Sequence, residues 1–258
     1  MTEKPTDDAR GGGVQSVVRS VQLLDALADA GGRMTHLELS TATGLPGATV
    51  HRLLQTLLQV GLVRQTPTRE YALGPRLVTL GEAATMGFDV WAMPHLRRLV
   101  DEVGETANLA MFDRDAIVYV AQVPSSHSMR MFTEVGKRVE THCTGVGKAM
   151  LAQMTDADVV AIARRAGLSR KTDRTLTTEE DLLSALGEIR RDGYAVDDGE
   201  QELGVRCIAM PLPHTGRRFA VSVSGPAARV TADRDADIVP ALRRAAAAIA
   251  AELTRYDA

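Results

Sequence analysis

The sequence predicts an α+β protein of two domains, and three observations lead to that prediction. Its 258 residues exceed the length of the usual single domain. Apolar residues recur at helical spacing through residues 14–60, whereas several short apolar or alternating stretches after residue 105 are typical of strands. Helices at one end and strands interspersed with helices at the other indicate a helical domain followed by an antiparallel sheet with helices packed on it.

Composition limits the class of protein and its compartment. Hydrophobic residues make up 45% of the chain, enough for a core in each domain. No apolar run approaches the roughly 18 residues that cross a membrane, and the N-terminal sequence MTEKPTDDARGGG lacks the apolar core of a secretion signal. Cys143 and Cys207 give no disulfide framework, which fits a reducing compartment. We therefore expect a cytoplasmic protein.

The first domain is expected to begin after a disordered tail. Residues 1–13 are polar and end in three glycines. The sequence VQSVVRSVQLLDALADAGG then predicts a helix closed by Gly31 and Gly32. Arg19, near its start, is a candidate contact to DNA phosphates, although a solvated helix start explains it nearly as well. The apolar stripe expected on this helix consists of Val17, Val18, Val21, Leu24 and Leu27.

The stretch PGATVHRLLQTLLQV, residues 46–60, predicts an amphipathic helix. Its opposite side has no acid and carries short polar and basic side chains, which suit phosphates and base edges. A shorter helix at 37–43 precedes it, and Gly44 and Pro46 are suited to close one helix and open the next. Two helices joined by a tight glycine turn predict a helix-turn-helix. The apolar side consists of Val50, Leu53, Leu54, Leu57 and Leu58.

A hairpin is predicted downstream, where LVRQTPTREYAL alternates apolar and polar residues around residues 66–68. A hairpin after a helix-turn-helix is a wing, so residues 14–75 are expected to form a winged helix-turn-helix. The alternative is an ordinary three-helix bundle, which shows the same periodicity. Residues 14–76 hold six Arg and four acids, a net charge of +2, and the whole chain has a net charge of -3. The DNA-binding prediction therefore depends on pattern, because charge this low holds non-specific DNA weakly.

Residues 76–90 are expected to form a linker helix. After Gly74 and Pro75 the sequence RLVTLGEAATMGFDVW resumes helical spacing. A narrow seam of leucine and alanine is a natural place for two chains to meet. The seam could equally pack on its own chain. Its expected members are Leu73, Leu77, Leu80 and Ala84.

Residues 91–258 are expected to form the sheet domain. Helix VWAMPHLRRLVDEVG, with Pro94 in its first turn, precedes a hairpin that turns at residues 113–115. Thr177 with Glu180 three residues later predicts a capping box. Pro240 should kink the last helix or mark the start of its regular part. Strands are expected in SMRMF, GYAVDD, RCIAMPLP and RRFAVSVSG, and helices in THCTGVGKAMLAQM, DADVVAIARRAG, TEEDLLSALGEIRRDG and the closing ADRDADIVPALRRAAAAIAAELTRY.

Three loops of this domain carry groups that suit a small polar ligand. The sequence TGVGK, residues 144–148, places glycines at a helix start, where unpaired N–H groups attract an anion; tight packing of a glycine-rich turn on a strand explains the same pattern. Asp197 is followed ten residues later by Cys207, and two serines share one face of a strand. Met129 and Met131 form a further same-side pair. Together these groups predict a pocket for a small polar ligand such as a carboxylate.

The chain resembles the IclR-type transcriptional regulators over nearly its whole length. The matching segments are GVQSVVRSVQLLDAL with LPGATVHRLLQTLLQVGLVRQ, HCTGVGKAMLA, and GYAVDDGEQELGVRCIAMPL. In SMRMFTEVGKRV followed by HCTGVGKAMLA it is most similar to regulators of glyoxylate and allantoin metabolism. This resemblance implies a GAF-like effector domain at 91–258 and a ligand-controlled repressor that reads a palindromic operator as a homodimer or a pair of dimers. The effector expected is a carboxylate or ureide, such as glyoxylate or a metabolite of allantoin.

The resemblance also implies which residues act. On the recognition helix, residues 49, 51, 52 and 55 would approach the major groove, and the wing arginines would meet phosphates. Val146 and Val139 stand where glyoxylate-type members commonly have alanine and leucine. The predicted DNA-binding residues are Arg19, Ala48, Thr49, His51, Arg52, Gln55, Arg64 and Arg69. The predicted effector-binding residues are Met131, Val139, Gly145, Val146, Asp197, Cys207, Ser222 and Ser224.

Two other classes of function are weighed on the same residues. A cysteine-dependent racemase or amidase would use Cys143 and Cys207 with His142, but His142 points away from Cys143 if that segment is extended. A zinc site at His142, Cys143, Cys207 and His214 lacks the usual ligand spacing. We therefore expect no catalytic residue, no metal and no cofactor.

Overall fold

The computed structural model describes residues 14–85, 88–131, 134–213 and 218–256. The chain divides into two compact units, residues 1–84 and 85–258, and each has a hydrophobic core of its own. The predicted subdivision at residues 13, 75 and 90 stays a prediction. No helix among the described residues is both long and apolar enough to traverse a bilayer.

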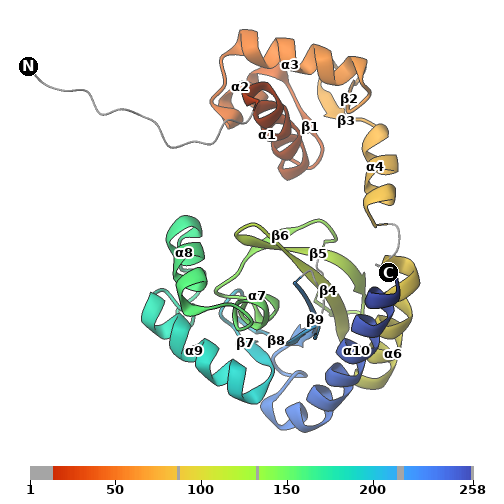
Figure 1. Cartoon of the computed structure of the whole chain (residues 1–258). Coiled ribbons are helices and arrows are strands. Elements are labelled where there is room, and N and C mark those ends of the chain that lie inside the picture. The colour runs from red at the N-terminus through yellow and green to blue at the C-terminus, as the bar shows by residue number, and fades with distance from the viewer. Residues whose placement is uncertain (1–13, 86–87, 132–133, 214–217, 257–258) are drawn as a thin grey trace, which may run out of the picture. The chain divides into compact units, whose positions relative to one another are not determined.

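The first unit is a helical bundle with a small sheet (Figure 1). Its helices are α1 (Gln15–Asp29), α2 (His36–Thr43) and α3 (Gly47–Gln59), and α4 (Arg76–Thr85) follows them. The sheet has the order β1-β3-β2, with β1 (Arg33–Met34), β2 (Val63–Gln65) and β3 (Tyr71–Leu73). Antiparallel β2 and β3 confirm the predicted hairpin.

The turn between α2 and α3 has the local structure that the sequence requires. Gly44 ends α2 with a φ of 66°, a left-handed conformation that glycine adopts at little cost. The imidazole of His36 lies 3.0 Å from the carbonyl oxygen of Gly47 and ties the two helices together. The predicted apolar side of α3 is confirmed, since Val50 and Leu54 are fully buried and Leu53 and Leu57 nearly so.

Two predictions in this unit are wrong. On α1 the predicted stripe holds at Leu27, which is buried, and at Leu24, which is partly buried, but Leu23 is buried instead of its other members. Those members, Val17, Val18 and Val21, are about half exposed or more. More than one face of this helix has apolar residues at helical spacing, and the periodicity alone does not say which face is buried. The valines in the first half of α1 have few neighbours within the first unit. Leu73 lies in β3 instead of on the linker helix, because the strand continues to that residue.

The second unit is built on a six-stranded antiparallel sheet of order β6-β5-β4-β9-β8-β7 (Figure 1). The hairpin predicted around residues 113–115 is confirmed, with Arg114 in the left-handed region at its tip. The strands are β4 (Thr106–Asp113), β5 (Ala116–Val123), β6 (Arg138–Glu140), β7 (Ala195–Asp198), β8 (Val205–Pro211) and β9 (Phe219–Pro226).

Helices cover both faces of this sheet. One core joins the sheet to α5 (Phe88–Trp91), α6 (Met93–Val103) and α10 (Asp235–Tyr256), and the other joins it to α7 (Gly145–Leu151), α8 (Asp156–Ala166) and α9 (Glu179–Asp192). Successive strand residues alternate between the cores: Leu109 packs in the first and Ala110 in the second. The predicted α+β fold, an antiparallel sheet with flanking helices, is confirmed.

Three details of the second unit differ from expectation. Residues 128–131 of the predicted SMRMF strand are not a strand, and its last residue, Phe132, lies outside the described residues. The cap of α9 is Thr178, which bonds to Asp181, one residue later than the predicted capping box. Pro240 lies inside α10, which begins at Asp235 after a short 3₁₀ turn (Ala232–Arg234), so it does not mark the start of the helix; the predicted kink stays a prediction.

Candidate functional site

The register of the sheet brings polar residues from four strands into one row. Thr106 on β4 is opposite Ser224 on β9, and Ser224 is opposite Cys207 on β8. Cys207 in turn is opposite Asp197 on β7. Directly opposed side chains in an antiparallel sheet point to the same face. Residues spread over more than a hundred positions of the chain therefore lie side by side.

A cavity of about 70 Å³ opens over this row. It has room for a few water molecules or a ligand of similar size. Six of the eight predicted effector-binding residues line it: Met131, Val139, Gly145, Asp197, Cys207 and Ser224. The other two, Val146 and Ser222, are fully buried and do not line it. Six further lining residues were not among the predicted effector-binding residues: Tyr119, Lys137, Thr144, Gln201, Glu202 and Val205.

The two glycines of α7 are required by close packing. A Cβ on Gly145 would lie 3.1 Å from Sγ of Cys207, and one on Gly147 would lie 2.2 Å from the carbonyl oxygen of Thr141. Thr144 caps the helix, because its hydroxyl accepts the N–H of Gly147 and donates to the carbonyl oxygen of Glu140. The alternative explanation of the glycine pattern, a turn packed on a strand, is therefore correct; Gly145 lines the cavity as well.

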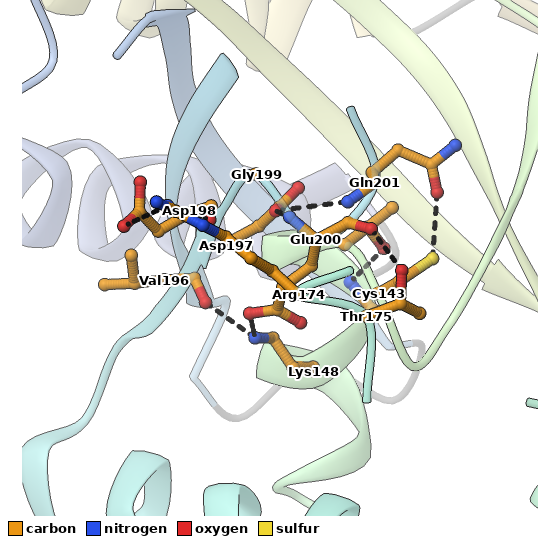
Figure 2. Close-up of polar contacts among 12 residues, drawn as sticks. Cys143, Lys148, Arg174, Thr175, Val196, Asp197, Asp198, Gly199, Glu200 and Gln201 are labelled. Carbon is orange, nitrogen blue, oxygen red and sulfur yellow. Dashed lines mark hydrogen bonds and ion pairs between the residues drawn. The ribbon is translucent and has the colours of Figure 1, made fainter. Parts of the chain in front are cut away.

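The loop that follows β7, which supplies Gln201 and Glu202 to the cavity wall, is held by a buried cation (Figure 2). The ammonium of Lys148 donates to the carbonyl oxygen of Val196 at 2.7 Å and pairs with Glu200. Burial raises the pKa of Glu200, an effect that Lys148 opposes, and Oε2 of Glu200 has no hydrogen-bond partner among the described residues. Gln201 accepts a hydrogen bond from the thiol of Cys143 at 2.8 Å.

Asp197 is a buried carboxyl group in the cavity wall, and its surroundings change its pKa. Its Oδ1 accepts the backbone N–H of Glu200 at 2.8 Å and that of Gln201 at 3.4 Å. Burial nevertheless raises the pKa of Asp197 to about 7, because removal from water penalises the charged form more than these bonds favour it. The carboxyl group can thus act as donor or acceptor near neutral pH.

A buried amide, Asn108, orders the hydroxyls beside the cavity. Its Nδ2 donates to Ser224 at 3.0 Å and to Ser222 at 3.4 Å, while its Oδ1 accepts from Gln122 at 2.9 Å. Asn108 is 1% exposed. No sequence pattern indicated this residue, since only the pairing of β4 with β9 brings residue 108 to residues 222 and 224.

The segment that carries Met131 is held in place from two sides. Thr106 donates to the carbonyl oxygen of Met131 at 3.1 Å. Arg229 donates to the carbonyl oxygen of Met129 and pairs with the buried carboxylate of Glu105. Met129 is 72% exposed whereas Met131 lines the cavity, so the predicted same-side pair is wrong. The two residues belong to a loop, where the two-residue repeat of a strand does not apply.

Neither thiol has the surroundings of a nucleophile. Burial raises the pKa of Cys143 and of Cys207 to about 12, whereas a reactive cysteine needs a lowered pKa. The His142 ring approaches the carbonyl oxygen of Ser169 at 3.1 Å and the carboxylate of Glu140 at 3.5 Å. Its described contacts are thus with oxygen atoms instead of sulfur.

One group in the described part of the chain could hold a metal ion: Glu140, His142 and Cys143, whose ligand atoms lie within 4.8 Å of one another. Lys171 and Ser169 already bind the carboxylate of Glu140. Cys207 is not part of this group, and His214 of the zinc site considered above lies outside the described residues.

The candidate DNA interface is the outer side of α3 together with the wing. Of the eight predicted residues, Thr49 and Arg19 are half-buried and the other six are exposed. Arg69 stands at the tip of the hairpin with a φ of 64°. The predicted residues on α3 lie outside its buried face, four of them exposed and Thr49 half-buried at the edge of that face. They are Ala48, Thr49, His51, Arg52 and Gln55.

Comparison with known proteins accounts for both units. Residues 16–67 match the IclR helix-turn-helix domain, and residues 85–251 match the C-terminal domain of bacterial IclR transcriptional regulators. The chain is 38% identical to the transcriptional repressor IclR of Escherichia coli K12 over 231 residues, 86% of this chain and 84% of that protein. It is 36% identical to the acetate operon repressor of Salmonella typhimurium over 230 residues, with the same shares covered.

Solved structures agree with these matches. An IclR transcriptional regulator from Alicyclobacillus acidocaldarius is 26% identical, with a TM-score of 0.83 over 94% of this chain and 100% of that one. A transcriptional regulator from Rhodococcus sp. RHA1 is 32% identical, with a TM-score of 0.79 over 95% of this chain and 100% of that one.

Proposed function

This chain belongs to the IclR family of bacterial transcriptional regulators, and from that membership we propose that it is a repressor controlled by a small carboxylate or ureide. It is a DNA-binding regulator, and its family and relatives are not enzymes. We propose that it acts in the cytoplasm, where operator DNA is accessible. A homodimer, or a pair of dimers, would read a palindromic operator, because two-fold protein symmetry is mirrored in the DNA.

The row of polar side chains beneath a small cavity is the observation that supports an effector most strongly. Ser224, Cys207 and Asp197 come from three strands and converge on one space, which is typical of ligand pockets with a few fixed polar groups. The cavity volume suits a molecule of the size of glyoxylate. Binding there would alter operator affinity if the two DNA-binding states differ in effector affinity.

The effector proposal is tested by thermal shift on the full chain with glyoxylate, pyruvate, allantoate and allantoin. A ligand that binds the folded cavity raises the melting temperature by mass action. Ser224→Ala should reduce that shift, since the Ser224 hydroxyl lines the cavity. Thr254→Ala, a hydroxyl on α10 that donates to the carbonyl oxygen of Ala250, serves as control. An unchanged shift in the Ser224 variant would exclude its hydroxyl from effector binding.

The recognition-helix proposal is tested with Arg52→Ala. Arg52 is exposed on the acid-free side of α3. Loss of a base or phosphate contact should weaken operator binding by about 1 to 3 kcal/mol and leave effector binding unchanged. Arg170→Ala removes the same charge from an exposed position of the second unit. An electrophoretic mobility shift assay at fixed salt measures the operator affinity of each variant, and Arg52→Ala should bind more weakly than Arg170→Ala. Equal operator affinities of the two variants would contradict the assignment of α3 to the DNA interface.

A further inference from the structure

Two of the four basic residues that line the cavity or the groove beside it are paired with acids. The adjoining groove, about 460 Å³, shares Lys137, Val139 and Gln201 with the cavity. Arg138 pairs with Asp113 and Lys171 with Glu140. Arg114 lines only the groove, and among the residues that the structure describes none accepts a hydrogen bond or an ion pair from its guanidinium. Lys137 lines both spaces, and no described residue accepts a hydrogen bond or an ion pair from its ammonium.

The backbone holds Lys137 at this place. Its N–H donates to the carbonyl oxygen of Glu134 at 3.0 Å, and its carbonyl oxygen accepts the N–H of Tyr119 at 3.2 Å. Gly136 also donates to the carbonyl oxygen of Tyr119 at 2.8 Å. These bonds fix the backbone of Lys137 next to Tyr119, which lines the cavity. The long side chain of Lys137 is exposed and can adjust its conformation.

The neutral groups of the wall are arranged as donors. Asn108 donates its amide protons to Ser224, so the hydroxyl proton of Ser224 is left for another acceptor. Burial raises the pKa of Tyr119, which keeps its phenol protonated. Of the two acids that line the cavity, Asp197 is engaged by backbone N–H groups and Glu202 is exposed to water.

We propose that Lys137 selects the effector by charge, so that the cavity takes a small carboxylate whose anionic end lies between the Lys137 ammonium and the Ser224 hydroxyl. This inference rests on the proposed function and goes beyond it by choosing the acid over the neutral ureide. A charge-assisted hydrogen bond to a carboxylate is lost when the ligand is an amide, and a donor-lined wall favours a group that only accepts.

The test compares each acid with its own primary amide on the full-length protein. Pyruvate and pyruvamide, and glyoxylate and glyoxylamide, are titrated by calorimetry without DNA. The wild type should bind the acid about 10- to 100-fold more tightly than the amide. Lys137→Gln should lose most of that preference, and Lys137→Arg should keep it. Arg114→Gln, which removes a charge from the groove but not from the cavity wall, should behave as wild type.

Each outcome decides the matter. Equal binding of acid and amide by the wild type, or an unchanged preference in Lys137→Gln, would overturn the role of Lys137 and leave the effector cavity in place. Failure of the wild type to bind any of the four compounds would overturn the charge selection and would also remove the small carboxylates from the proposed effector class. A circular dichroism spectrum identical to that of the wild type makes the result of Lys137→Gln independent of folding.

Discussion

Asp197 should give the second unit a stability that depends on pH. Its pKa is raised from 3.8 to about 7 in the folded chain. Between these values the folded state binds more protons than the unfolded state, so the free energy of unfolding falls as pH rises. This contribution is full below about pH 4 and lost once pH passes about 7. Asparagine has no proton to exchange, and its oxygen can still accept the N–H of Glu200.

Asp197→Asn should therefore gain stability relative to the wild type as pH rises from 5 to 8, by at most about 4 kcal/mol over the full range. Trp91, the single tryptophan, is buried in the core of the same unit and reports its unfolding by fluorescence. Urea titrations at each pH measure the difference. Parallel pH profiles for the two proteins would show that Asp197 titrates normally.

Gly147 should tolerate no side chain. A Cβ there would lie 2.2 Å from a backbone oxygen and 2.6 Å from Cα of Thr141, atoms that cannot move aside cheaply. Gly147→Ala should destabilise the second unit by about 1 to 3 kcal/mol or more. Gly187→Ala in α9 is the control, because nothing lies within 4 Å of its Cβ and alanine favours a helix by about 1 kcal/mol. Equal melting temperatures would contradict the packing described for α7.

At the residue scale, the sequence predicted several residues that line the cavity but neither Asn108, which donates a hydrogen bond to one of them, nor Lys137. Asp197 and Ser224 could be chosen because they stand near strand ends close to a glycine, whereas Cys207, which lies inside β8, was chosen for its place ten residues after Asp197. Asn108 and Lys137 could not be chosen, since their importance comes from pairings such as that of β4 with β9, which no local pattern specifies. The side-chain period holds at Ser222, which shares a face with Ser224, but Ser222 is bonded to Asn108, is fully buried and does not line the cavity.

Among the helices, the start of α9 is a sharp test of local structure. The hydroxyl of Thr178 accepts the N–H of Asp181 at 3.1 Å and donates to its carboxylate at 2.6 Å. Thr178→Ala should cost about 1 kcal/mol, the usual value for loss of an N-cap. Thr177→Ala should cost little, because Thr177 is not the cap. Urea unfolding followed by Trp91 fluorescence compares them; a larger loss in the Thr177 variant would restore the capping box predicted from sequence.

Long helices with a strong apolar period were predicted within a few residues, whereas the shortest strands were predicted only where a turn signal joins them, as between β2 and β3. The helices α3, α6 and α9 have strong apolar periods and were found within a few residues of their bounds. The strands β1 and β6 have two and three residues, too few to show a period, and exist because β3 and β5 offer an edge to pair with. The buried face of α1 is set by the helices that pack on it, so it could not be predicted from the sequence of α1 alone.

For the whole molecule, the proposed function gives the two units separate tasks. The first has a core of its own beneath α3, and the second has two cores on either side of its sheet. Regulation requires that effector and operator binding be linked through the chain, with the same factor in both directions. A ligand that binds both DNA-binding states equally would regulate nothing, however tightly it binds.

That linkage is measured most directly by the dissociation constant for duplex DNA from the region beside the protein's own gene, with and without saturating pyruvate or glyoxylate. Fluorescence anisotropy at fixed salt gives both values. We predict a change of about fivefold or more, the lower end of typical coupling, with Lys137→Gln showing less change at the same ligand concentration. An identical dissociation constant with the cavity shown to be occupied would contradict the claim that this cavity controls DNA binding.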